Sequence, residues 1–249
     1  MKGGLFTLYR LFGKFRSMLS ELEQGLFEHF PTDLATASLI ASGVEREGLR
    51  VYLGKIAYLV QLISRDIPLE LAEVERARAI FDWLWRSKPN RYKSGGNFTL
   101  TEVIDAQLGE GVWVGNCLGL TTLYNSLAQR LGIETVVIHL ENAFGRGPHV
   151  LSRLHTDKGS VEIENILPQG FDYRGHLSNS EREEWGRHEL VADIYFSKGN
   201  AFLLGGRPRD AIDDYDKALY LNPGYINVYV NKGIAISQIH GKGLTRALE

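Results

Sequence analysis

The stretch GNCLGLTTLYNSLAQRLG, residues 115–132, holds Cys117, the only cysteine of this 249-residue chain. Apolar residues recur in it every three or four positions, which predicts one face of a helix. Asn116 is placed to cap the start of this helix, and Gly132 is placed to end it. Cys117 then lies in the first turn, where free backbone N–H groups and the helix dipole favour a thiolate. The stretch therefore predicts a nucleophile, provided that the rest of the chain supplies a base.

The composition of the chain narrows the classes of protein to which it can belong. Hydrophobic residues make up 44% of the sequence, which is enough for a core in one domain or two. A net charge of −2 gives no indication of nucleic-acid binding. A single cysteine excludes an internal disulfide and fits a reducing, cytoplasmic compartment. No apolar run approaches the roughly 20 residues that cross a bilayer.

The histidines show no spacing that is typical of a metal site. With one cysteine in the chain, the seven histidines have no Cys-rich zinc motif to join. None of them occurs in an HxxxH or HExxH pattern. From the sequence we therefore expect neither a metal nor another cofactor.

Residues 1–20 combine apolar side chains with basic ones and contain no acid. Arg10 interrupts the apolar run, so the segment lacks the core of a secretory signal. A helix lying on a membrane surface is compatible with this pattern. We favour a helix that packs on its own domain or on a partner, because apolar stripes usually belong to a core.

The chain before Cys117 predicts a series of helices. Pro31 marks a break after the acidic residues that follow the basic segment. Apolar periodicity then predicts helices, with turn residues between the last two. These helices cover residues 33–42, 49–64, 67–85 and 99–108, and the loop covers residues 88–97.

The chain after the Cys117 helix predicts antiparallel strands. Residues 133–140 are rich in β-branched side chains and predict a first strand. Two more strands, 149–156 and 160–166, are joined by a hairpin signal at 157–159. Helices followed by antiparallel strands indicate an α+β domain.

From about residue 180 the chain is expected to be helical again and to contain a repeat. Seven positions match the tetratricopeptide pattern, and three more match it one repeat length further on. The first set is Tyr195, Gly199, Phe202, Ala211, Tyr215, Ala218 and Pro223, and the second is Tyr229, Gly233 and Ile236. The pattern predicts one full repeat over 192–225 and an incomplete second one. Since about three repeats are usually needed for stability, we expect this part to pack on the preceding domain or to belong to a longer array.

A thiol nucleophile needs a base and a polar group that orients the base. His149 begins a predicted strand, and the partner strand of the hairpin carries Glu162, Glu164 and Asn165. A residue about 15 positions after the histidine should lie beside it in the sheet. Side chains alternate faces along a strand, so a shift of one residue decides between Glu164 and Asn165. The residues alone leave this choice open.

Four short motifs carry a resemblance to a known family. They read Cys117-Leu118-Gly119, Arg130-Leu131-Gly132-Ile133, Pro148-His149-Val150 and Gly159-Ser160-Val161-Glu162-Ile163-Glu164. In this order they resemble the transglutaminase-like core, a relative of the papain-type cysteine hydrolases. The likeness covers about residues 60–170, and with the trailing repeats the chain is similar to bacterial proteins of the SirB1 type. The resemblance implies a triad of Cys117, His149 and Glu164, with Glu164 where the family usually has Asp.

The resemblance implies a domain order and a function. We expect an N-terminal helical segment over 1–45, a transglutaminase-like domain over 46–178 and a tetratricopeptide region over 179–249. In that core the helix that carries Cys117 would pack on a small antiparallel sheet. The implied function is a cysteine-dependent amide or ester hydrolase or an acyltransferase, whose repeats bind a protein or peptide partner. The alternative is an inactive domain of this type that serves as an interaction scaffold.

Other residues have weaker claims to the site. Trp113 and Asn116 precede the nucleophile and are placed to border the oxyanion position with the Cys117 N–H. Packing explains Trp113 equally well, and helix capping explains Asn116. His139, His155 and His176 match no family position.

Overall fold

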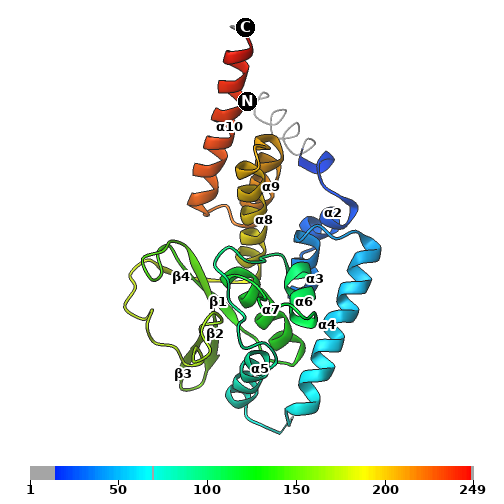
Figure 1. The fold of residues 1–249 in the computed structure, drawn as a ribbon, viewed down its shortest axis with the longest axis vertical. Helices are drawn as coiled ribbons and strands as arrows, with labels where there is room; N and C mark the ends of the chain where they lie inside the picture. Colours follow the sequence, from blue (N-terminus) through cyan, green and yellow to red (C-terminus); the bar gives the residue numbers. More distant parts are fainter. Residues whose placement is uncertain (1–14, 69, 248–249) are drawn as a thin grey trace, which may run out of the picture. The chain divides into compact units, whose positions relative to one another are not determined.

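The computed structural model describes residues 15–68 and 70–247 (Figure 1). The chain divides into two compact units. One unit is Thr32–Leu190, and the other combines the first 31 residues with Val191–Glu249. The domain boundaries near residues 45 and 178 stay a prediction.

The unit Thr32–Leu190 combines helices with a four-stranded antiparallel sheet (Figure 1). Its strands follow the order β3-β2-β1-β4. The predicted combination of helices and a small antiparallel sheet is confirmed. The helices are α3 (Leu34–Ala41), α4 (Arg46–Asp66), α5 (Glu73–Ser87), α6 (Leu100–Leu108) and α7 (Cys117–Arg130), and the strands are β1 (Val136–Leu140), β2 (His149–Thr156), β3 (Gly159–Ile163) and β4 (Arg182–Trp185).

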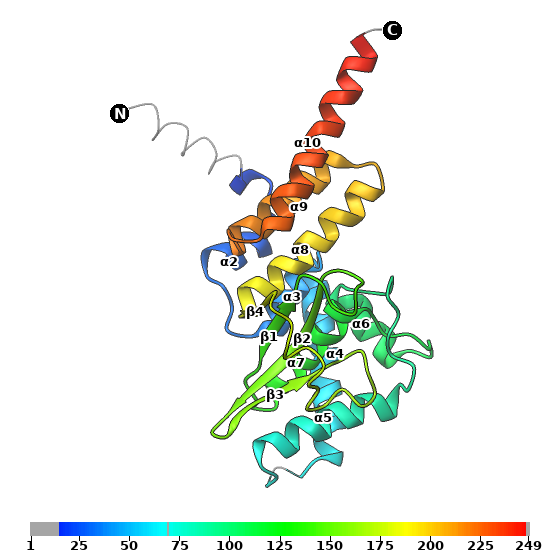
Figure 2. The ribbon, with the colours of Figure 1, turned by 90° about the vertical axis from the view of Figure 1, so that its left-hand side faces the viewer.

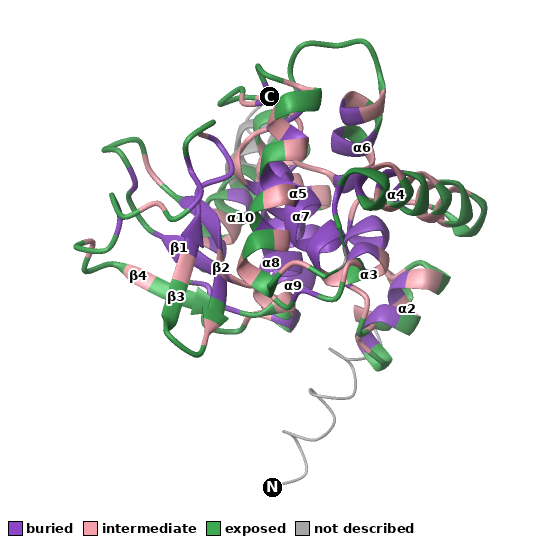
Figure 3. Cartoon of the chain, turned by 90° about the horizontal axis from the view of Figure 1, so that it is seen from below, coloured by how far each residue is buried: buried purple, intermediate pink, exposed green. Residues whose placement is uncertain are grey.

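Helix α7 lies at the centre of this unit. Every residue from Leu118 to Ala128 is buried, as the colouring of Figure 3 shows along α7. The helix packs on β2 and also contacts α3, α4, α5 and α6. It begins at Cys117, and the Asn116 side chain accepts a hydrogen bond of 3.0 Å from the Gly119 N–H. It ends at Arg130, two residues before Gly132, so the predicted bounds of this helix are confirmed.

Helix α5 begins later than the sequence predicts. We expected it to begin at Ile67-Pro68, but it begins at Glu73. Ile67 has extended backbone angles and ends α4, because the residue before a proline is driven out of the helical region. The Ala72 N–H donates to the Glu75 carboxylate at 3.2 Å. This bond satisfies one of the backbone N–H groups that have no partner within the helix at the start of α5.

Strand β4 corrects the expectation that the chain is helical from about residue 180. It pairs with β1, with Arg182 opposite Leu140 and Trp185 opposite Val137. Its sequence, REEW, lacks the apolar alternation that predicts a strand. Side-chain contacts hold it instead, since the Trp185 ring stacks on His139 with centroids 3.9 Å apart. Helix α8 begins only at Arg187.

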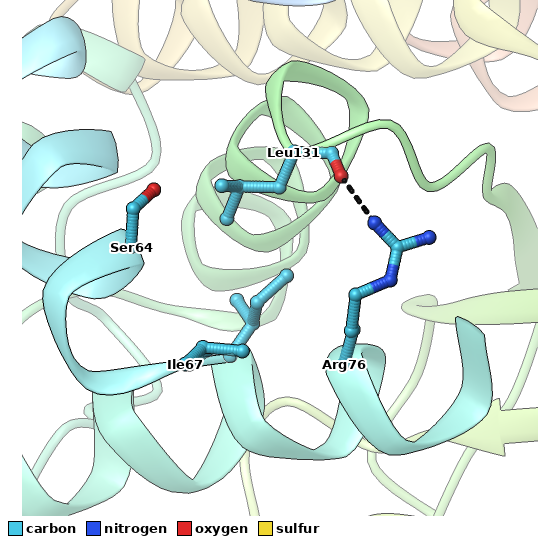
Figure 4. Close-up of a pocket in the computed structure, with 5 residues that line it drawn as sticks. Ser64, Ile67, Arg76 and Leu131 are labelled. Atoms are coloured by element: carbon cyan, nitrogen blue, oxygen red, sulfur yellow. Dashed lines mark hydrogen bonds between the residues drawn. The ribbon is translucent and has the colours of Figure 1, made fainter. Parts of the chain in front are cut away.

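The helical side of the core is closely packed. It contains a small cavity of about 10 Å³ (Figure 4). In this cavity the Arg76 guanidinium donates to the Leu131 carbonyl at 3.1 Å. The cavity is about the size of one water molecule, so it has no room for a substrate. It is lined by Ser64, Ile67, Arg76, Ile80 and Leu131.

The other unit contains α8 (Arg187–Leu204) from Val191 onward, α9 (Pro208–Leu221), α10 (Ile226–Ala247) and α2 (Glu21–Glu28). Figure 2 shows α8 and α9 lying alongside each other, as a repeat requires. Gly199 makes their close approach feasible, because a Cβ there would lie 2.5 Å from the Tyr215 ring. The predicted helical repeat is confirmed.

Helix α2 packs on the repeat within this unit. The Tyr195 hydroxyl donates to Glu23 at 3.1 Å, and the Lys217 ammonium lies 2.8 Å from the same carboxylate. The Phe27 ring meets Tyr220 edge-on, with centroids 5.0 Å apart. A single repeat exposes apolar surface on both sides, and α2 covers part of it.

The basic N-terminal segment lies mostly outside the described residues, which begin at residue 15. Phe15 stacks on Tyr220 with ring centroids 5.1 Å apart, so its described end packs within its own unit. Among the described helices, none is long and apolar enough to cross a membrane.

Gly199 and Gly233 occupy equivalent positions of successive repeats and provide a matched pair of variants. We expect Gly199→Ala to lower the free energy of unfolding by about 1–3 kcal/mol, because the new methyl overlaps the buried Tyr215 ring. A methyl group added at Gly233 would have no atom within 4 Å. Gly233→Ala should therefore be neutral or stabilise by up to about 1 kcal/mol, since alanine is the better helix former. Urea denaturation of both variants measures this, and equal effects would contradict the close packing of α8 on α9.

Candidate active site

His149 begins β2, and its ring contacts the buried acid predicted for it. Its Nε2 lies 2.8 Å from Glu164 Oε2, and the two side chains are 6% and 0% exposed. Two buried side chains in this geometry form a strong, charge-assisted hydrogen bond. The structure therefore brings together two of the three residues predicted for the triad.

A tight turn after β3 directs Glu164 toward His149. The strand ends at Ile163, earlier than the predicted residue 166, and the Glu164 N–H donates to the Gly170 carbonyl at 2.8 Å. A Cβ on Gly170 would lie 2.0 Å from the Glu164 carbonyl oxygen, so only glycine fits this turn. The carboxylate is thus held by backbone geometry as well as by its partner.

Cys117 is the third member of the group and is only partly buried. Because Glu164 occupies Nε2 of His149, Nδ1 is the ring nitrogen left for the thiol. Burial lowers the pKa of His149, but hydrogen bonds with Cys117 and Glu164 outweigh it and raise the pKa to about 10. The imidazole is therefore protonated at neutral pH and pairs with the Glu164 carboxylate.

Glu164 stays ionised although it is fully buried. Burial raises the pKa of this carboxyl, but the hydrogen bond with His149 and the His176 imidazole 3.3 Å away outweigh that effect and leave the pKa below its usual value. A buried carboxylate without such partners would take up a proton instead. The charge of Glu164 is thus available to hold an imidazolium.

Asn165, the open alternative for the third position, lies in a different network. Its amide nitrogen donates to Ser152 Oγ at 2.9 Å and to Thr121 Oγ1 at 3.2 Å. Ser152 in turn donates to Asn125 at 2.5 Å. These buried bonds join α7 to β2 and to the segment after β3. Asn165 therefore positions the elements that carry Cys117 and His149.

Removal of the Ser152 hydroxyl tests this network. We expect Ser152→Ala to lower the free energy of unfolding by about 1–3 kcal/mol, because the buried Asn125 oxygen loses the hydroxyl that donates to it and the Asn165 amide loses one of its acceptors. Ser160 lies exposed on the neighbouring strand and is the matched control. Chemical denaturation of Ser152→Ala and Ser160→Ala should show a loss in the first alone. A loss of the same size in Ser160→Ala would remove the argument for a special role of the network.

The remaining predicted residues lie in other surroundings. Trp113 is half exposed, and the side-chain oxygen of Asn116 is engaged in capping α7. Burial lowers the pKa of His139, which stacks on Trp185. His155 is exposed, with its Nε2 3.1 Å from Glu184.

His176 is a site residue that sequence spacing fails to identify. It is 5% exposed, and its Nε2 lies 3.3 Å from the same Glu164 oxygen that bonds His149. It follows Glu164 by 12 positions in an irregular segment, where spacing predicts no neighbours. His149, Glu164 and His176 together form a group of donors that could hold a metal ion.

An aromatic side chain borders these two histidines. The Phe144 ring meets His176 edge-on at 4.6 Å between centroids, and it lies 5.7 Å from His149. Phe144 has a φ of 54°, which is uncommon for a residue with a side chain, and it is half exposed. The sequence analysis did not predict its contact with His149.

Comparison with known proteins identifies the repeat. Residues 192–225 match the family model described as tetratricopeptide repeat, which are the residues predicted for the full repeat. No curated protein and no solved structure gives a significant match. Tetratricopeptide repeats generally mediate protein–protein interaction, so this unit contains a protein-interaction module.

Helix α10 offers this module an apolar surface. Several large apolar side chains of α10 are exposed within the described residues, although such side chains usually lie in a core. They are Ile226, Tyr229, Val230, Ile234 and Ile236.

Proposed function

We propose that the chain is a cysteine-dependent amide or ester hydrolase, or an acyltransferase, of the transglutaminase-like type. One observation carries the proposal: a buried His149–Glu164 pair at 2.8 Å has the Cys117 thiol as the further hydrogen-bonding partner of its imidazole. Geometry of this kind activates a thiol, whatever fold presents it. The tetratricopeptide module would bring a protein partner, and a thiol nucleophile suits a reducing cytoplasmic compartment.

The chemistry follows from the three side chains. The Cys117 thiolate attacks the carbonyl carbon of an acyl group, and the carbonyl electron pair moves to oxygen. The tetrahedral intermediate then expels an amine or an alkoxide, which takes a proton from the His149 imidazolium. A thioester on Cys117 remains.

The second half of the reaction regenerates the enzyme. Water or an amine attacks the thioester while His149 accepts its proton, and the Cys117 thiolate leaves. Water gives hydrolysis, and an amine gives acyl transfer. Glu164 holds the imidazole in one orientation throughout and balances its positive charge.

The start of α7 supplies the remaining requirement. Cys117 is the first residue of a helix whose cap, Asn116, satisfies the Gly119 N–H. The backbone N–H groups of a first helical turn carry partial positive charge. They are therefore suited to stabilise the oxyanion of the tetrahedral intermediate.

Alkylation of the single cysteine tests the proposal without knowledge of the substrate. At pH 7 a fluorescent iodoacetamide should label Cys117, and His149→Ala should slow the labelling about tenfold or more. The physical reason is that an ordinary thiol, with a pKa of about 8.5, is only a few per cent ionised at this pH.

The matched control is His155→Ala, which removes an exposed histidine from the same strand. Its labelling rate should equal that of the wild type. If His149→Ala is also labelled at the wild-type rate, the thiol is not activated and the triad is wrong. The chain would then be the inactive interaction scaffold, for which the exposed apolar residues of α10 are the supporting observation.

A further inference from the structure

Two imidazoles face one carboxylate oxygen in the buried part of the site. Glu164 Oε2 lies 2.8 Å from His149 Nε2 and 3.3 Å from His176 Nε2. All three donor atoms lie within 4.8 Å of one another, and the three side chains are buried. A triad needs only the first imidazole, so the second calls for an explanation.

His176 is held in this position without a good hydrogen bond at its inner nitrogen. Among the described residues, no partner of proper hydrogen-bond geometry reaches its Nε2, although Glu164 lies nearby. A buried polar atom without a well-formed hydrogen bond destabilises the fold. A cation between the two imidazoles and the carboxylate would satisfy all three groups.

The donor set and its spacing suit zinc. Zinc binds imidazole nitrogen and carboxylate oxygen at about 2.0–2.2 Å, which places tetrahedral ligands about 3.3–3.5 Å apart. The Glu164 oxygen lies 2.8 Å and 3.3 Å from the two imidazole nitrogens, and the three donor atoms all lie within 4.8 Å of one another. Small shifts of these side chains would therefore bring the donor atoms to the separations that zinc requires. Two histidines and one glutamate fill three positions and leave the fourth to water. We propose that His149, Glu164 and His176 form a Zn²⁺-binding site.

Zinc at this site would block the nucleophile. With Nε2 bound to the metal, the neutral imidazole keeps its hydrogen on Nδ1 and has no lone pair left to accept the Cys117 proton. Glu164 would also leave the imidazole for the metal. This inhibitory role rests on the proposed function, whereas the metal site itself does not.

The direct test is a zinc titration of untagged, chelator-treated protein, followed by calorimetry. The wild type should bind one Zn²⁺ at this site, and His176→Ala should weaken the binding about tenfold or more. His155→Ala removes a histidine that also lies beside a glutamate but is exposed, and it should bind as the wild type does. Cys117→Ser should retain the site, because the thiol lies at the other ring nitrogen.

Two results would overturn the proposal. One is wild-type zinc affinity in His176→Ala. The other is loss of binding in Cys117→Ser, which would place the metal on the thiol and His149 instead. Circular dichroism checks the fold of each variant, and His176→Gln provides a second test because it keeps a polar side chain that is a poor zinc ligand.

Alkylation of Cys117 gives a separate readout. Zinc should slow the labelling of the wild type and leave that of His176→Ala unaffected, and equal slowing of both would contradict the site. The calorimetric result does not depend on thiol activation. If His149→Ala disproves the triad, the zinc titration therefore still decides the metal site on its own.

Discussion

The packing of helix α7 on strand β2 is the constraint on which the site depends. It places Cys117, at the start of the helix, beside His149, at the start of the strand. The Thr121 hydroxyl donates to the Val150 carbonyl at 3.2 Å and so fixes the helix along the strand. A slip of one helical turn would move the thiol by about 5.4 Å and separate the pair. The core around α7 therefore serves the site as much as it serves stability.

The electrostatics of the site follow from the burial of Glu164. A carboxylate with no exposure must be paired, and the two imidazoles on one of its oxygens provide that pairing. The same arrangement serves two proposed purposes, because one imidazole orients toward the thiol and the other completes a set of metal donors. Proton and metal would compete for the same nitrogen of His149. Thiol chemistry and zinc binding are thus alternatives at one site.

Capping residues and the repeat pattern correctly predicted the helices whose bounds depend on interactions between residues close in sequence. The cap at Asn116 and the stop at Gly132 gave the bounds of α7, and the repeat pattern gave residues 192–225. Long-range contacts decided the rest. Strand β4 is held by its pairing with β1 and by the stacking of Trp185 on His139. Its sequence has no apolar alternation from which a strand could be predicted. His176 reaches Glu164 through an irregular segment, so no spacing could have placed it there.

The imidazole nitrogens of His149 provide the most direct measurement of the central claim, that its ring is held between Cys117 and Glu164. Selective ¹⁵N labelling of histidine and an NMR titration of metal-free protein would report the protonation of that ring. We predict that His149 stays an imidazolium through neutral pH and loses its proton only near pH 10. A titration near the ordinary histidine value of about 6.5 would show that the ring lacks these partners, and it would contradict the claim.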